Sequence, residues 1–200
     1  MAKYDRKDHY HQRAKSEGYR SRAAYKLAEI QAAHRLMRRG QKVVDLGCWP
    51  GGWLQIASEA VGREGRVVGI DLAAIDPPLE NANVVAIQGD ITEGPVLEGV
   101  SEALGGLADV FLSDAAPKLT GVRAVDRAKE EGLLESIEAR IPELLRPGGA
   151  LLLKILEGPE AQTVDRRLRA GFERAKTVRV SASRKGTTER YLLARGYRGA

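Results

Sequence analysis

Lys154 is the residue whose type and place in the sequence most clearly suggest chemistry. It interrupts the apolar run 150–156, where a purely structural strand would carry another aliphatic residue. Burying an ammonium group costs free energy, and desolvation favours the neutral amine. A neutral amine is the form that a general base needs to take a proton from a weakly acidic hydroxyl. On this run alone, a lysine that reaches solvent from a strand end is the simpler interpretation.

The composition indicates one domain with unevenly distributed charge. The 200 residues are 43% hydrophobic, and their net charge is +5. Residues 1–22 hold seven Lys/Arg against three acids, and residues 165–200 hold eleven against three, so the centre of the chain is acidic. Basic ends suggest that a polyanion such as RNA is held at the periphery. A merely solvated charged surface gives the same pattern.

The N-terminus and the cysteine content favour a cytoplasmic protein. Residues 1–6 are charged where a signal peptide would be apolar, and the apolar runs are too short to span a bilayer. We therefore expect no membrane association, and we expect a monomer. Cys48, the single cysteine, excludes an internal disulfide. No metal site is expected, because His9 and His11 lie on a polar arm.

The order of the expected elements is typical of a parallel α/β sheet. Residues 1–20 are interpreted as a basic N-terminal arm, and residues 21–200 as a single domain. A helical stripe begins at Ser21 and is expected to end near Gly40. Short β-type runs then alternate with helical patterns, which predicts crossover connections. These runs are 42–46, 66–72, 83–88, 108–113 and 150–156.

The C-terminal part predicts a reversed strand. Helices are expected over 125–146, closed by Pro147-Gly148-Gly149, and over 159–172. The runs 176–181 and 190–195 are separated by too few residues for a crossover helix, so the last strand should be antiparallel. Seven strands with the last one reversed, and helices on both faces, form the Rossmann-like fold of S-adenosylmethionine-dependent methyltransferases.

The first strand leads into a glycine-rich loop. In open α/β sheets, ligands bind beyond the carboxyl ends of the strands, where Gly47, Gly51 and Gly52 would let the backbone approach one closely. A dinucleotide site would need G-x-G-x-x-G, but Trp49 replaces the second glycine. Asp45 favours the cationic amino-acid end of S-adenosylmethionine over a pyrophosphate. A plain strand-to-helix turn is the alternative interpretation.

The next two strands also end in carboxylates. Asp71 is placed to accept hydrogen bonds from ribose hydroxyls, and Asp90 is placed for an adenine amino group. Taken singly, each is more often a cap or turn residue. Three successive strands that end in aspartate favour a nucleoside-bearing cofactor.

The residues after the fourth strand favour an oxygen atom as the methyl acceptor. Ser113-Asp114-Ala115-Ala116-Pro117 lacks the Asn/Asp-Pro-Pro-aromatic motif of enzymes that methylate exocyclic amines. The similar segment 76–79 follows the second strand instead. Methylation at C5 of a base generally needs a cysteine near strand four, and Cys48 is on another loop.

Several segments together carry a family resemblance: 21–27, 45–47, 50–53, 88–90, 113–114, 116–117, Lys154, 183–184 and Glu189. With them the chain resembles the FtsJ-type (RrmJ-like) ribosomal RNA 2′-O-ribose methyltransferases, and within these the large-subunit methyltransferase E group. The resemblance runs from about residue 8 to residue 195. The chain departs from the family pattern at Cys48-Trp49, at Lys118 and at Leu156-Glu157.

The resemblance implies a site and a substrate. The family's Lys-Asp-Lys-Glu tetrad falls on Lys26, Asp114, Lys154 and Glu189. Its contacts to S-adenosylmethionine fall on Gly51, Trp53, Asp71, Asp90 and Asp114. The implied substrate is a uridine ribose in the 23S rRNA of the large ribosomal subunit. Lys154 would accept the 2′ proton, Asp114 would orient Lys154, and Lys26 and Glu189 would hold the ribose.

Three other functions are compatible with parts of the pattern. A tRNA anticodon-loop 2′-O-ribose methyltransferase shares the tetrad. An NAD-dependent oxidoreductase would need the missing dinucleotide glycine pattern. A non-catalytic RNA-binding protein could retain the same fold.

Overall fold

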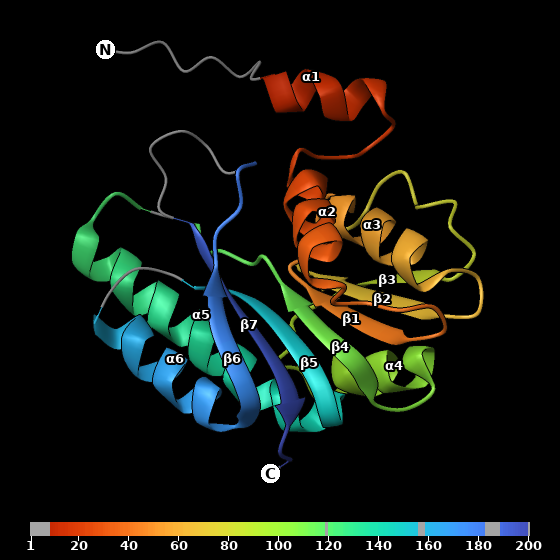
Figure 1. The fold of residues 1–200 in the computed structure, drawn as a ribbon. Helices are drawn as coiled ribbons and strands as arrows, with labels where there is room; N and C mark the ends of the chain where they lie inside the picture. The colour runs from red at the N-terminus through yellow and green to blue at the C-terminus, as the bar shows by residue number, and fades with distance from the viewer. Residues whose placement is uncertain (1–8, 119, 156–158, 183–188, 200) are drawn as a thin grey trace, which may run out of the picture.

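The computed structural model describes residues 9–118, 120–155, 159–182 and 189–199 (Figure 1). Within these ranges, a seven-stranded sheet is covered by helices on both faces. The strands are β1 (Lys42–Leu46), β2 (Arg66–Asp71), β3 (Val84–Gln88), β4 (Ala108–Ser113), β5 (Leu145–Ile155), β6 (Phe172–Val178) and β7 (Arg190–Tyr197). The helices are α1 (His9–Ser16), α2 (Ala23–His34), α3 (Gly52–Val61), α4 (Gly94–Leu104), α5 (Arg123–Leu144) and α6 (Pro159–Ala170).

The strand order confirms the predicted fold class. The sheet runs β3-β2-β1-β4-β5-β7-β6, and its first five strands are parallel. Strand β7 is antiparallel to both β5 and β6, as expected from the short gap before it. Because β7 is reversed, its first residues lie beside the carboxyl end of β5, where Lys154 pairs with Tyr191.

Two strand predictions and one helix end need correction. Helix α2 ends at His34 and not near Gly40, because Arg35 takes a left-handed conformation and its N–H donates to the Gln31 carbonyl. Strand β5 begins at Leu145, so the segment 147–149 lies within its bounds and forms a bulge, because the register with β4 jumps from Leu145 to Ala150. Strand β6 covers Phe172–Val178 and not 176–181. Its end is set by Glu29, whose carboxylate accepts from the Ser181 N–H and hydroxyl.

Helix α1 lies inside residues 1–20, which were interpreted as a basic N-terminal arm and not as a helix. The sequence of α1 is mostly polar and has no apolar stripe that would indicate a helix. Ala14 of this helix is nevertheless buried. The chain after α1 is held against α3. The Arg20 N–H donates to Gln55 Oε1, and Gln55 Nε2 donates to the Gly18 carbonyl, each at 2.9 Å. The segments 156–157 and 183–184 lie outside the described residues.

Two apolar cores hold the sheet, one on each face. Helices α2 and α3 pack on one face, and α4, α5 and α6 on the other (Figure 1). Leu151 and Leu153 of β5 enter one core, and Leu152 enters the other. A central strand buried on both faces is expected to be almost continuously apolar, which is why its lysine was conspicuous. Among the helices described here, none has the length and apolar character needed to cross a membrane.

We expect Leu152→Ala to lower the free energy of unfolding by roughly 2–5 kcal/mol, because it leaves a cavity in a packed central strand. Leu152 is fully buried. The matched control is Leu107→Ala, at a position that is 42% exposed, which should change stability by about 0.5 kcal/mol or less. Urea unfolding of both variants measures the difference, and equal losses would contradict this account of β5.

Candidate active site

Four charged side chains, far apart in the sequence, meet at the carboxyl ends of β4 and β5. Asp114 follows β4, and its Oδ1 lies 3.1 Å from Lys154 Nζ. Its Oδ2 lies 3.6 Å from Lys26 Nζ, which comes from α2. Lys26 Nζ is also 2.9 Å from Oε2 of Glu189, the residue before β7. The carboxylate of Asp114 thus lies between the two lysines, and all four predicted tetrad residues come together.

The tetrad is largely withdrawn from solvent. The side chains of Lys26 and Lys154 are 7% and 10% exposed, and that of Asp114 is 16% exposed. Glu189 is the most open, at 27%. Buried charges persist only when they are paired and hydrogen-bonded, and here two cations face two anions. Lys154 Nζ also donates to the main-chain carbonyl of Asp114, at 2.6 Å.

Tyr191 belongs to this network, although the sequence did not single it out. Its hydroxyl donates to Asp114 Oδ1 at 2.8 Å, and its side chain is fully buried. Burial, and then the charge of Asp114, raises the pKa of Tyr191, so the phenol remains a donor. The available signal was its place in β7. Once the antiparallel register with β5 is known, Tyr191 falls opposite Lys154.

The glycine-rich loop packs directly against the segment that carries Asp114. Gly47 has a φ of +77°, and a Cβ built on it would lie 2.6 Å from the Cβ of Ala115. Gly51 has a φ of +107° at the start of α3. Both positions therefore require glycine for conformation, and Gly47 also requires it for space. The loop thus places its backbone directly against Ala115, the residue after Asp114.

Asp45 places a buried carboxyl group in β1. It is 1% exposed, and neither carboxyl oxygen has a hydrogen-bond partner among the described residues. Burial, followed by the charges of Asp114 and Asp71, raises the pKa of Asp45 well above its usual range. A buried polar group normally finds a partner. A ligand that brings N–H donors to the end of β1 would supply one.

The other predicted cofactor residues are already partly engaged by the protein. Asp71 accepts the main-chain N–H groups of Trp49 and Ala73, both at 2.9 Å. Asp90 Oδ1 accepts from the N–H and the hydroxyl of Thr92, both at 2.8 Å, and these bonds lower the pKa of Asp90. The contacts with Ala73 and Thr92 are the turn contacts expected of such aspartates, whereas the contact with Trp49 ties Asp71 to the glycine-rich loop. Each carboxylate retains lone pairs for a further donor.

The side chain of Trp53 lies in the core and not at the loop surface. It is 3% exposed, and its indole Nε1 donates to the Ala23 carbonyl at 2.9 Å. Its ring also packs against Tyr191, with centroids 5.9 Å apart. Trp53 thus fixes α2, and with it Lys26, over the sheet. Its main chain, at the start of α3, is the part nearest the loop.

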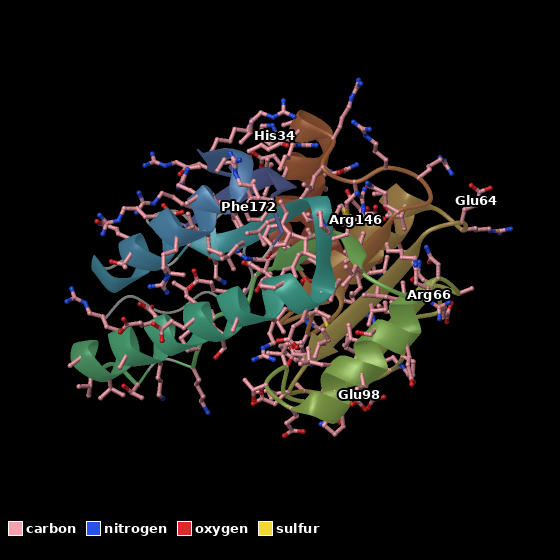
Figure 2. The ribbon with its side chains drawn as sticks, turned by 90° about the horizontal axis from the view of Figure 1, so that it is seen from below. His34, Glu64, Arg66, Glu98, Arg146 and Phe172 are labelled. Carbon is pink, nitrogen blue, oxygen red and sulfur yellow. The ribbon has the colours of Figure 1, made fainter. Side chains whose placement is uncertain are left out.

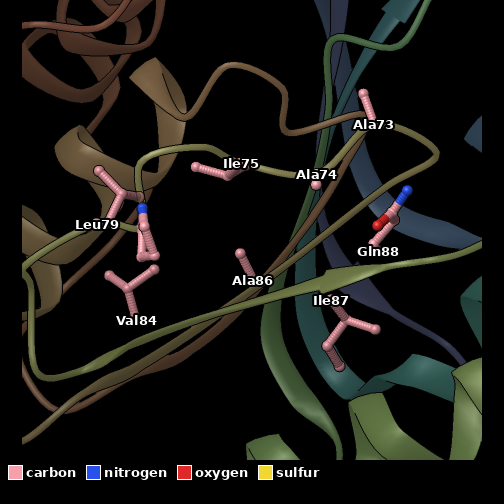
Figure 3. A pocket seen from close by; sticks show the side chains of 9 residues that line it. Ala73, Ala74, Ile75, Leu79, Val84, Ala86, Ile87 and Gln88 are labelled. Atoms are coloured by element: carbon pink, nitrogen blue, oxygen red, sulfur yellow. The ribbon is translucent and has the colours of Figure 1, made fainter.

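A hollow of about 220 Å³ lies beside the predicted nucleoside contacts (Figure 3). It separates the segment 73–79 from β3, with Ala73 and Gln88 at one end and Leu79 and Val84 at the other. Its lining contains no ionisable side chain. The hollow can therefore contribute shape and apolar contact, whereas the charged chemistry belongs to the tetrad.

The fold and site define a class, which is the Rossmann-like methyltransferases. Fibrillarin from Aeropyrum pernix, solved with S-adenosyl-L-methionine, shares the fold with a TM-score of 0.61 at 18% identity, over 86% of this chain and 75% of that one. A Plasmodium falciparum protein described as a ribosomal RNA methyltransferase has a TM-score of 0.79 at 28% identity, over 91% of this chain and all of that one.

The sequence comparisons identify the family. The model for "FtsJ-like methyltransferase" matches residues 19–197. The ribosomal RNA large subunit methyltransferase E of Methanothermobacter thermautotrophicus is 42% identical, over 97% of this chain and 92% of that relative. The protein of the same name from Acidithiobacillus ferrooxidans is 43% identical, over 96% and 87%. The chain belongs to the FtsJ-like methyltransferase family, which confirms the resemblance.

We expect the stability of the protein without ligand to depend on pH through Asp45. An unfolded aspartate titrates near pH 4, whereas folding raises the pKa of Asp45. Its contribution to stability is complete below about pH 4 and is lost as the pH rises toward the folded pKa. The loss is up to about 1.4 kcal/mol per pH unit.

Asp45→Asn should remove that part of the pH dependence. Urea unfolding between pH 5 and pH 8 measures it as the difference between wild type and variant. Asp76→Asn is the control, because Asp76 is exposed, and it should follow the wild-type slope. Parallel curves for wild type and Asp45→Asn would show that the carboxyl group is not neutral in the folded protein.

Proposed function

We propose that this chain transfers a methyl group from S-adenosylmethionine to the 2′ oxygen of a uridine ribose in the 23S rRNA of the large ribosomal subunit. The observation that carries the proposal is the buried Lys26–Asp114–Lys154–Glu189 tetrad at the end of the sheet. It is supported by relatives that are more than 40% identical and are named ribosomal RNA large subunit methyltransferase E.

The cofactor assignment rests on the fit of the residues around the glycine loop. Asp45 has two buried oxygens without a partner in the described protein, and the amino group of a methionyl ligand would satisfy them. Asp71 and Asp90 retain acceptor capacity for ribose hydroxyls and an adenine amine, respectively. Gly47 and Gly51 have no side chain, so a ligand can approach the backbone of the loop closely. S-adenosylmethionine, when bound, supplies an electrophilic methyl group on a sulfonium.

The protein's own part in the reaction is to orient the hydroxyl and accept its proton. Lys154 Nζ is held beyond β5 by the Asp114 carboxylate and carbonyl. Once its ammonium group has released one proton to solvent, the resulting amine accepts the 2′ proton. Lys26 and Glu189 form the opposite wall and hold the ribose. Tyr191 keeps Asp114 in position. The low exposure of the tetrad excludes water from the proton transfer.

Lys154→Ala should abolish methyl transfer and leave the affinity for S-adenosylhomocysteine unchanged, because the proton acceptor is lost while the glycine loop is intact. Transfer of a radiolabelled methyl group to rRNA and calorimetric titration of the thioether product measure the two effects. Lys129→Ala is the matched control at an exposed position on α5. Normal turnover of Lys154→Ala would refute its assignment as the base.

The acceptor is tested by comparing large ribosomal subunits, naked 23S rRNA and tRNA as substrates, followed by digestion to nucleosides. We expect 2′-O-methyluridine from the ribosomal substrates, since the similar relatives are named ribosomal RNA large subunit methyltransferase E. Methylation of tRNA alone would favour the anticodon-loop alternative. Cellular rRNA methylation that persists in a strain carrying Lys154→Ala would favour a non-catalytic RNA-binding role.

The organisation of the chain forms part of the same proposal. Residues 1–20 serve as a basic arm for RNA, and residues 21–200 form one methyltransferase domain. The protein acts in the cytoplasm as a monomer. Membership of a methyltransferase family argues against the NAD-dependent oxidoreductase.

A further inference from the structure

A second group of cations lies at the far end of β7 from the tetrad. Arg195 pairs with Ala150 of β5 and with Arg174 of β6. Lys176 is two residues further along β6, and its Nζ lies 3.3 Å from Nδ1 of His34, at the end of α2. Figure 2, which views the molecule from below, shows His34 beside β6 and β7. We call Arg38, Arg174, Lys176 and Arg195, with His34, the β6–β7 basic edge.

One member of this edge has a structural role. The Arg195 guanidinium donates to the carbonyls of His34 and Arg35, at 2.7 and 3.2 Å, and so satisfies the C-terminal end of α2. The Lys176 ammonium can only donate, so the Nδ1 of a neutral His34 accepts from it. Arg38, Arg174 and Lys176 are exposed, and their charges are available to a ligand.

The cations of the edge differ from those of the tetrad in their pairing. In the described part of the chain, none of its four cations is paired with a carboxylate. The pKa of Arg195 is lowered by burial and then by Arg38 and Arg174. The pKa of His34 is lowered by burial and then by Lys176 and Arg195. The surroundings of both groups are therefore cationic, unlike the tetrad, where each cation faces an anion.

We propose that the β6–β7 basic edge binds phosphates of the RNA that carries the target ribose, which rests on the proposed function. Arg195 lies four residues along β7 from Tyr191, about 13 Å at about 3.3 Å per residue. His34 lies eight residues along α2 from Lys26, about 12 Å at 1.5 Å per residue. Both routes place the edge within a few nucleotides of the tetrad. An unpaired cationic surface at that distance complements a phosphodiester backbone.

The test is the double variant Arg174→Gln/Lys176→Gln in the full chain, with a naked 23S rRNA transcript as probe. We expect the slope of log affinity against log salt to become shallower by roughly 1–2, because each lost phosphate contact removes about 0.7–0.9. The KM for rRNA should rise roughly tenfold near 0.1 M salt, while kcat and the affinity for S-adenosylhomocysteine stay unchanged. Arg63→Gln/Arg66→Gln removes the same charge from the turn before β2 and from its first residue, and should behave as wild type. Figure 2 shows Arg66 away from His34.

Three results would overturn the proposal. They are an unchanged salt slope in the double variant, an equal loss in the control, and weaker binding to large subunits without weaker binding to naked rRNA. The third result would indicate a protein partner. Arg38→Gln, in the loop after α2, is a second variant that leaves the sheet intact, and it should reduce the slope by about 1. A wild-type chain that fails to methylate rRNA would refute the proposed function, whereas the salt slopes test the edge separately.

Discussion

The site depends on one carboxylate that is shared between two buried ammonium groups. Lys26 and Lys154 are almost withdrawn from water, and neither could remain charged there without an anion in contact. Asp114 uses one oxygen for Lys154 and Tyr191 and turns the other toward Lys26. Because Glu189 takes the remaining contact of Lys26, the quartet is neutral as a whole. Loss of any member would leave an uncompensated buried charge. The four segments that carry these residues, although distant in the sequence, therefore depend on one another for stability.

The reversed strand makes this convergence possible. Parallel strands all present their carboxyl ends at one edge of the sheet, which places Asp45 and Asp114 near Lys154. Because β7 runs antiparallel to β5, its beginning lies at this same edge, and Tyr191 and Glu189 arrive beside Lys154. A parallel β7 would place them at the opposite end of the sheet. The same reversal carries Arg195 to the far end, where it satisfies the last carbonyls of α2.

The number and order of the strands along the chain could be predicted from the sequence, because each buried strand is a short apolar run between glycines and polar turns. β1 and β4 were predicted to the residue, whereas the β5 start and the β6 end depend on contacts made elsewhere, such as that of Ser181 with Glu29. The meeting of the tetrad came from a family resemblance, since spacing alone does not bring Lys26 to Glu189. Asp45 was predicted as a cofactor contact, but neither its lack of a hydrogen-bond partner among the described residues nor the contact of Tyr191 with Asp114 could be predicted, because both depend on which groups face them across the fold.

Electrostatics divides the molecule into two functional parts. At the tetrad, anions and cations cancel over a few ångströms, so this region exerts little attraction on a distant polyanion, and added salt hardly screens it. Long-range attraction must come from cations that are not paired with a carboxylate, and the described chain has such cations at the β6–β7 basic edge. The separation has a physical advantage. Strong phosphate contacts at the reacting ribose would hold the substrate equally in its ground and transition states, which does not raise the rate of the chemical step. In our proposal, placing them about 13 Å away, by the strand rise, lets RNA be captured by charge while the methyl acceptor is positioned by a dry, neutral set of donors and acceptors.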